Sequence, residues 1–338
     1  MLIPHQKLTV EPSDIFRGLF PQKSNLSNYI PKKTNFIGDA SAGIQLALQD
    51  KEIKNVGLPS FTCVMVLKAI EAANKTPVFI DAGVILEEIE KRNFDTLVLP
   101  YNFGFIPDLD KIVKFCKKNN ITLVEDCAQA LGAEYKDKLV GSFGKYCVYS
   151  FGISKNIGFT GGLINKEVNL TQLPKSKLFN LIIKGLVGKY FFNPYLYSKG
   201  LMEKEITKGY KIDYSSIPNY VKNVVFSISQ RYDKILKTRR ENAKICVEEL
   251  DGVIDFVRPL KNTKPTWLYF ILMDKNREII KKKLLKESVD MQPLLTFKDL
   301  SNHGKKAKKA EQEHLAFALY RPKWEIDYMI KKIKKVAK

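Results

Sequence analysis

The stretch LVEDCAQALGAEYKDKLVGSFGKYCVYSFGISKNIGFTGGLI, residues 123–164, decides the fold. Its first apolar run ends in Asp126, and the preceding residues 108–120 carry apolar side chains at helical spacing. A helix followed by a buried strand predicts an α/β sheet, in which ligands lie beyond the carboxyl ends of the strands. Asp126 is at such an end. The run 145–151 predicts a second strand, and residues 162–164 begin a third.

A lysine, Lys155, lies in the connection between the second and third predicted strands, 29 positions after Asp126. It follows the serine-aromatic pair at 150–151 and precedes the glycine pair at 161–162. A lysine in a partly desolvated loop can lose its proton and form a Schiff base. An acid facing a pyridine nitrogen keeps that nitrogen protonated, which makes the ring an electron sink. Asp126 and Lys155 therefore supply the two groups that pyridoxal phosphate (PLP) chemistry requires.

Each of these two residues alone has an ordinary structural explanation. The chain has 56 Lys and Arg residues, most of them expected on a solvated surface, and an acid at a strand end often caps a helix. The joint pattern is more specific. The runs EDCAQALGA (125–133) and SFGISKNIGFTGG (150–162) closely resemble the DegT/DnrJ/StrS family of PLP-dependent sugar aminotransferases. The family pattern is E-D-x-A-Q-x-x-G-A, followed by S-F-x-x-x-K-x-x-G-x-x-G-G.

The resemblance implies an α/β fold of the aspartate-aminotransferase type (fold type I). We expect a large, mostly parallel sheet domain and a smaller C-terminal α+β domain, which suits a length of 338 residues. The expected parts are an N-terminal arm at 1–34, a PLP-binding domain at 35–222 and a small domain at 223–338. Residues from Val224 onward predict one long helix leading into the small domain.

The resemblance also implies roles for individual residues. Lys155 is expected to form the internal aldimine with PLP and to move protons at the substrate carbon. Asp126 is expected to pair with the pyridine nitrogen, and Gln129 to approach the ring hydroxyl. Ser150 and Ser41 are expected to contact the phosphate.

Small residues at 40–43 lead into a predicted helix and suit a phosphate site. Backbone N–H groups at a helix start can approach an anion, which the helix dipole favours, although an ordinary capped helix has the same pattern. The family reads S-G-T-x-A-L here, so Ser41 falls at the threonine and is followed by Ala42. Asp39 falls at the serine, which is a departure from the family.

Other positions also depart from the family. An aromatic residue that stacks on the pyridine ring often follows the family's threonine, but Cys63 follows Thr62 here, and core packing explains Cys63 equally well. The Asn and Arg that reach the partner subunit's cofactor are unmatched near Ser216 and Pro218. Lys155 and Asp126 are the expected catalytic residues, and the expected cofactor-binding residues are Lys155, Asp126, Gln129, Ser150, Ser41, Ala42 and Cys63.

Composition argues against several other classes. Five cysteines without C-x-x-C spacing and only three histidines make a metal site unexpected, and reduced thiols suit a cytoplasmic protein. The net charge of +20 favours anionic ligands, but only eight of the 56 basic residues are arginine. Because nucleic-acid sites favour arginine forks, we expect no nucleic-acid partner. We also expect neither a secretory signal nor a membrane-spanning helix.

The run LFNLIIKGLVGKYFFNPYLYSKGL, at 178–201, predicts an apolar, basic helical insertion. Its apolar stripe is interrupted by Lys184, Lys189 and Pro194. Two interpretations stay open. The run predicts either a core or dimer-interface helix, or a helix on the inner face of the membrane with its lysines at the lipid headgroups.

The resemblance implies an aminotransferase that moves an amino group from glutamate to a nucleotide-linked keto-sugar, for surface polysaccharide or glycoconjugate synthesis. Its active sites are expected between the two subunits of a homodimer. The family includes PLP-dependent dehydratases, but those replace the lysine with histidine, which Lys155 argues against. A non-catalytic or membrane-associated relative is the other alternative, because the partner-reaching residues are missing.

Overall fold

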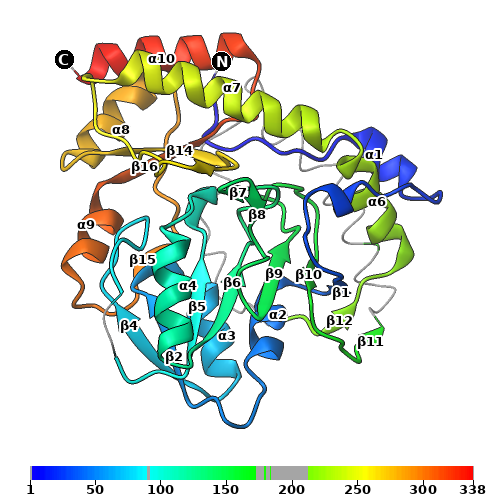
Figure 1. Cartoon of the computed structure of the whole chain (residues 1–338). Helices are drawn as coiled ribbons and strands as arrows, with labels where there is room; N and C mark the ends of the chain where they lie inside the picture. The colour runs from blue at the N-terminus through cyan, green and yellow to red at the C-terminus, as the bar shows by residue number, and fades with distance from the viewer. Residues whose placement is uncertain (1, 90–91, 173–178, 180–182, 184–211, 338) are drawn as a thin grey trace.

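The computed structural model describes residues 2–89, 92–172, 179, 183 and 212–337. Its largest element is a sheet of seven strands in the order β1-β10-β9-β6-β5-β2-β4 (Figure 1). The five strands from β9 to β4 are parallel, and β10 and β1 are antiparallel to their neighbours. The strands are β1 (Asn35–Ile37), β2 (Asn55–Pro59), β4 (Thr76–Ile80), β5 (Thr96–Pro100), β6 (Thr122–Asp126), β9 (Tyr146–Ser150) and β10 (Gly162–Ile164).

Apolar side chains alternate between the two faces of this sheet, and helices cover both faces. Val98, Val124 and Val148 pack with α2 (Ala40–Ala47) and α3 (Val64–Ala72). Leu97 and Leu123 belong to the opposite cluster, which contains the buried residues of α4 (Leu109–Lys118). Burial on both faces is the usual state of parallel strands. The predicted mostly parallel α/β sheet is confirmed, as is the helix expected before Asp126.

The C-terminal part forms a second apolar cluster around the antiparallel pair β14 (Tyr269–Met273) and β16 (His314–Ala318). The helix α7 (Tyr232–Leu250) lies beside α10 (Lys323–Ala337) across the top of Figure 1. The remaining described helices are α1 (Pro12–Arg17), α6 (Asn219–Ser229), α8 (Arg277–Lys286) and α9 (Lys305–Glu313), with 3₁₀ turns at Leu26–Asn28 and Asn102–Gly104.

The long helix expected from Val224 is in fact two helices, and that prediction was wrong. α6 ends at Ser229, and α7 begins at Tyr232. The intervening Arg231 donates to the Thr9 carbonyl oxygen at 2.5 Å and pairs with Asp14 in the N-terminal arm. Contacts with this distant segment therefore accompany the break, whereas neither Gly nor Pro lies at it.

Short strands join the two parts of the chain. β15 (Phe297–Asp299) pairs with β3 (Phe61–Cys63), and β13 (Thr263–Lys264) pairs with β7 (Glu134–Tyr135). The start of α9 is fixed by Asp81, which accepts hydrogen bonds from three of its first backbone N–H groups. The other short strands are β8 (Lys138–Leu139), β11 (Thr171–Gln172) and β12 (Ser215–Ser216).

The expected domain boundary after residue 222 stays a prediction. The boundary falls within α6, and the α6 residues beyond it, Val224 and Ile228, pack in the cluster on the α4 face of the large sheet. The expected insertion at 178–201 lies outside the described residues, apart from exposed Phe179 and Ile183. None of the helices that the structure describes is both long enough and apolar enough to cross a membrane.

Candidate active site

The candidate site lies at the carboxyl ends of β6 and β9. Asp126 ends β6 and Ser150 ends β9, and these two strands are parallel neighbours. Gly162 pairs with Ser150, and a Cβ on Gly162 would lie 3.1 Å from the Ala40 nitrogen. The start of α2 is therefore beside the end of β9. This edge of the sheet is where ligands bind in open α/β folds.

Asp126 is a buried carboxylic acid whose side chain faces few partners. Burial raises its pKa, while the Ala128 N–H at 3.0 Å and the positive charge of Lys155 act in the opposite direction. The residue is 6% exposed. The charge of Lys155 acts to lower the pKa of Asp126. The two side chains are therefore close enough to interact electrostatically.

Lys155 lies in a tight turn fixed on both sides. Its N–H donates to the Gly152 carbonyl oxygen at 2.8 Å, and the Gly152 N–H donates to Ser150 Oγ at 3.2 Å. On the far side, Asn156 Oδ1 accepts a hydrogen bond of 2.6 Å from Arg239 on α7. Tyr269 donates to the Ser154 carbonyl oxygen at 3.3 Å. The lysine is therefore presented by a supported loop.

Gln129 fixes a strained turn next to the site. Its Oε1 accepts from the Phe103 N–H at 2.6 Å, and its backbone carbonyl accepts from the Thr266 hydroxyl at 2.8 Å. Phe103 and Gly104 have positive φ values of 59° and 87°. Because the backbone N–H can only donate, the amide oxygen faces it, and the Nε2 group is left to donate elsewhere. A donor of this kind suits a ring hydroxyl oxygen.

Cys63 lies at the end of β3 and directly precedes α3. It is half-buried, and its Cα partner in the β3–β15 pair is Phe297. The preceding Thr62 donates to Asn102 Oδ1 at 3.1 Å, and Asn102 donates to the Phe61 carbonyl oxygen at 2.9 Å. This network fixes the backbone at Thr62. The predicted ring contact of Cys63 stays a prediction.

The start of α2 combines a buried hydroxyl with a carboxylate. Ser41 is 7% exposed, and Ala42 donates its N–H to Asp39 Oδ1 at 2.9 Å. Asp39 Oδ2 also accepts from the Asp213 N–H at 2.7 Å. The first N–H groups of a helix lack acceptors within it, so those of Ala40 and Ser41 can serve an anion.

Sequence reasoning missed the part played by Glu125. This fully buried carboxylate accepts from Tyr101 Oη at 2.7 Å and from the N–H groups of Gly141, Phe143 and Gly144 at 2.5 to 2.7 Å. It ties the loop before β9 to β6, directly behind Asp126. An acid inside an otherwise apolar strand was the available signal. Arg239 and Asn156 gave no comparable local signal, because their contact depends on how α7 packs.

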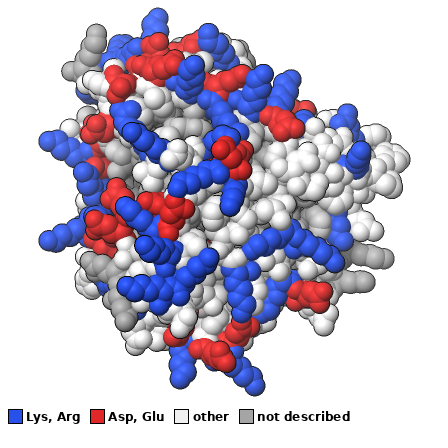
Figure 2. Space-filling model, in the orientation of Figure 1, with Lys and Arg blue, Asp and Glu red and all other residues white. Residues whose placement is uncertain are grey.

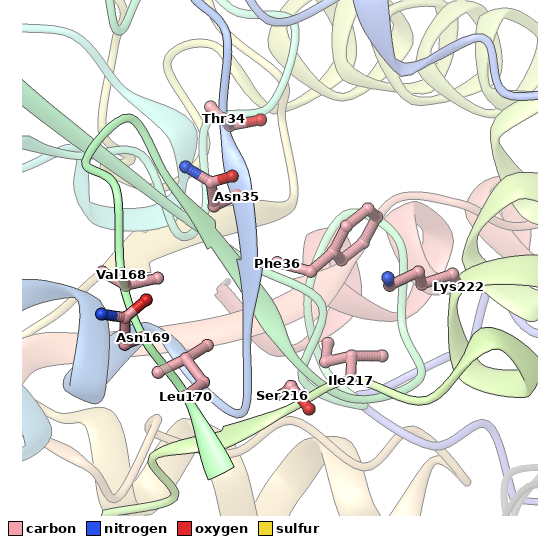
Figure 3. A pocket seen from close by; sticks show the side chains of 9 residues that line it. All are labelled: Thr34, Asn35, Phe36, Val168, Asn169, Leu170, Ser216, Ile217 and Lys222. Carbon is pink, nitrogen blue, oxygen red and sulfur yellow. The ribbon is translucent and has the colours of Figure 1, made fainter. Parts of the chain in front are cut away.

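A surface pocket of about 430 Å³ lies beside the edge strand β1 (Figure 3). The Lys222 ammonium is 5.6 Å from the centroid of the Phe36 ring, toward which it points. Asn35, at the other end of β1 from Asp39, also lines the pocket and pairs with Ile164. The pocket is thus displaced along β1 from the candidate site.

These residues fit PLP at three of its groups. A buried acid suits the ring nitrogen, an amide donor suits the ring hydroxyl, and Lys155 suits the aldehyde carbon. Ser150 and Ser41 place hydroxyls near the start of α2 for the phosphate. The carboxylate of Asp39 at this helix start opposes an anion.

The fold and this set of residues define the class of PLP-dependent transferases with an open α/β sheet. Residues 25–167 match the model of the DegT/DnrJ/EryC1/StrS aminotransferase family. Members of the family are PLP-dependent sugar aminotransferases, so the predicted family, enzyme class and cofactor are confirmed. They act on nucleotide-sugars with an amino donor and are typically dimeric.

Several curated relatives extend over different shares of the chain. An uncharacterized protein of Methanocaldococcus jannaschii is 28% identical over 79% of this chain and 74% of its own length. A GDP-perosamine synthase of Vibrio cholerae is 24% identical over 73% of this chain and 67% of its own length. A GDP-perosamine synthase of Escherichia coli O157:H7 is 32% identical, but the match covers only 33% of each chain.

Solved structures share the fold over nearly the whole chain. The sugar aminotransferase CalS13 of Micromonospora echinospora has a TM-score of 0.73 and 18% identity, and the alignment covers 99% of this chain and 100% of CalS13. DesV of S. venezuelae has a TM-score of 0.74 and 17% identity, with 96% and 94% covered. These likenesses confirm the fold.

Proposed function

We propose that this chain transfers an amino group from glutamate to a nucleotide-linked keto-sugar used for surface polysaccharide or glycoconjugate synthesis. The observation that carries the proposal is the buried acid Asp126, influenced by the positive charge of Lys155, at the carboxyl edge of a parallel sheet. Relatives named for perosamine synthesis and for a UDP-N-acetyl-3-dehydro-glucosamine aminotransferase support a nucleotide-sugar substrate.

PLP, when bound, supplies an electron sink that stabilises negative charge at the substrate carbon. Asp126 would hold a proton at the ring nitrogen, because its carboxylate would be paired there with the positive charge of the protonated ring. Lys155 would hold the cofactor covalently and later carry a proton to and from the substrate carbon. Gln129 would donate to the ring oxygen, and Ser150, Ser41 and the N–H of Ala40 would orient the phosphate. Ala42 would support this end through its bond to Asp39.

The test is a panel of nucleotide-linked keto-sugars offered to PLP-loaded protein with glutamate. Formation of 2-oxoglutarate together with an aminated nucleotide-sugar supports the proposal. The absorbance spectrum, recorded with and without glutamate, separates an enzyme from a non-catalytic relative. A cofactor spectrum that no amino donor changes would contradict the proposal.

We also propose a homodimer, with residues 178–201 in contact with either the partner subunit or an anionic membrane. Lys184 and Lys189 would each contribute about 1 kcal/mol at an anionic surface. Changing both to Glu should then release the protein from anionic vesicles at low salt without unfolding it. If wild-type protein does not sediment with vesicles and Phe191→Asp dissociates a dimer, the subunit contact is correct and the membrane contact is wrong.

A further inference from the structure

Asp39 occupies the place at which the cofactor phosphate is expected. It caps α2 through the Ala42 N–H at 2.9 Å, and the start of α2 lies beside the paired residues Gly162 and Ser150. The same helix start supplies the N–H groups of Ala40 and Ser41. The N-terminus of α2 thus binds the Asp39 carboxylate and would also bind the phosphate of PLP.

The carboxylate is held in place by two backbone donors. Asp39 Oδ2 accepts from the Asp213 N–H at 2.7 Å, in addition to the bond between Oδ1 and Ala42. In the described part of the chain, no lysine or arginine forms an ion pair with Asp39 within 4.0 Å. Within the described residues, the charge of Asp39 is offset by these two N–H donors and by the helix dipole, which carries about half an elementary charge.

We propose that Asp39 sets the cofactor affinity of this chain by opposing the phosphate of PLP. A carboxylate and a phosphate near one helix start repel each other and compete for the same dipole. The phosphate therefore contributes less to binding than the helix start alone would allow. The covalent link to Lys155 therefore contributes a larger share of the binding free energy of PLP. PLP also exchanges more readily whenever that link is broken. This inference rests on the site residues given in the proposed function.

The test compares PLP with pyridoxal, which has the same ring and aldehyde but no phosphate. Dissociation constants are measured by absorbance titration of cofactor-free protein, so no turnover is needed. Asp39→Asn and Asp39→Ser remove the charge and keep an oxygen that can cap α2. Both variants should bind PLP at least about tenfold more tightly, while pyridoxal binding changes by less than about threefold.

Asp95→Asn is the matched control. Asp95 also accepts two backbone N–H groups, from Lys54 and Asn55 at 2.9 Å, but it precedes β5 at the opposite end of the sheet. Its removal subtracts the same charge and should leave the ratio of the two dissociation constants as in wild type. Thermal unfolding of each variant verifies that the fold is retained.

The outcomes are distinct. If neither Asp39 variant binds PLP more tightly than wild type, or if both bind pyridoxal more tightly by the same factor, Asp39 does not oppose the phosphate and the proposal is wrong. If Asp95→Asn gives the same gain, the effect belongs to net charge and the proposal is also wrong. If wild-type protein shows no Lys155-dependent spectrum with either compound, the proposed function fails, and this inference fails with it.

Discussion

At the scale of single residues, Lys155 is the most direct test of the site. We expect PLP-loaded protein to be yellow and to be labelled by borohydride at Lys155, because the covalent link requires this amine. Lys155→Ala should lose both the visible band and the label. Peptide mapping by mass spectrometry provides the measurement. A label on any other lysine of wild-type protein would show that the assignment is wrong.

Asp126 should affect rate and stability in opposite directions. Asp126→Asn removes the charge that keeps the ring nitrogen protonated, so the half-reaction with glutamate should slow roughly a thousandfold, about 4 kcal/mol of transition-state stabilisation. Single-turnover absorbance kinetics measure this step. A near-normal rate would refute the role of Asp126.

The same substitution should stabilise the cofactor-free protein. Burial raises the pKa of Asp126 above its unfolded value of about 3.9, so ionisation destabilises the fold as pH rises through the folded pKa. Asp126→Asn cannot ionise and so does not lose this stability. The difference in Tm between the variant and wild type should therefore be larger at pH 7 than at pH 4. The pKa of Asp95 shifts in the opposite direction, because backbone hydrogen bonds lower it, so the ionised form of Asp95 stabilises the fold. Asp95→Asn should therefore lower the Tm at pH 7, and equal shifts in both variants would contradict the argument.

At the scale of elements, the turn after β5 should be intolerant of a side chain. A Cβ on Gly104, which has a φ of 87°, would overlap the Thr266 hydroxyl and lie 2.9 Å from the Gln129 carbonyl oxygen. Gly104→Ala should destabilise the protein by about 2 to 4 kcal/mol, from the left-handed backbone and the overlap together. Denaturant unfolding measures the change.

Gly252 is the control for that prediction. Its φ is 69°, but a Cβ there meets nothing within 4 Å. Gly252→Ala should therefore destabilise the protein only through its left-handed backbone, by about 1 kcal/mol. Equal losses in the two variants would mean that the contact with Thr266 and Gln129 is not what limits position 104.

The elements show which features the sequence could predict. The strand ending at Asp126 and the loop holding Lys155 follow from short apolar runs and local motifs, so both were predictable. The break between α6 and α7 was not, because it coincides with contacts between Arg231 and the arm residues Thr9 and Asp14, more than 200 positions away. The support of Asn156 by Arg239 likewise depends on tertiary packing.

At the scale of the whole molecule, the excess of basic residues is spread over the visible face. Figure 2 shows Lys and Arg among Asp and Glu over most elements, and a broad uncharged area where Figure 1 places α1 and α6. The exposed residues Phe16, Leu19 and Phe20 belong to or follow α1. This area could not be predicted from the sequence, because its apolar residues are few and do not recur at helical spacing over a long stretch.

The first residues of the N-terminal arm have backbone partners in the C-terminal part of the chain. Ile3 donates its N–H to the Ser288 carbonyl oxygen at 3.0 Å, and the His5 carbonyl oxygen accepts from the Ala318 N–H at 2.7 Å. At roughly 5 to 20 residues per second, a ribosome needs about 15 to 60 s to make Ala318 after His5. During translation, Ile3 and His5 can therefore form these hydrogen bonds only after residues 288 and 318 have left the exit tunnel. The pair β14–β16 thus forms only after residue 318 has emerged, whereas all strands of the large sheet are made by residue 164 and can assemble earlier.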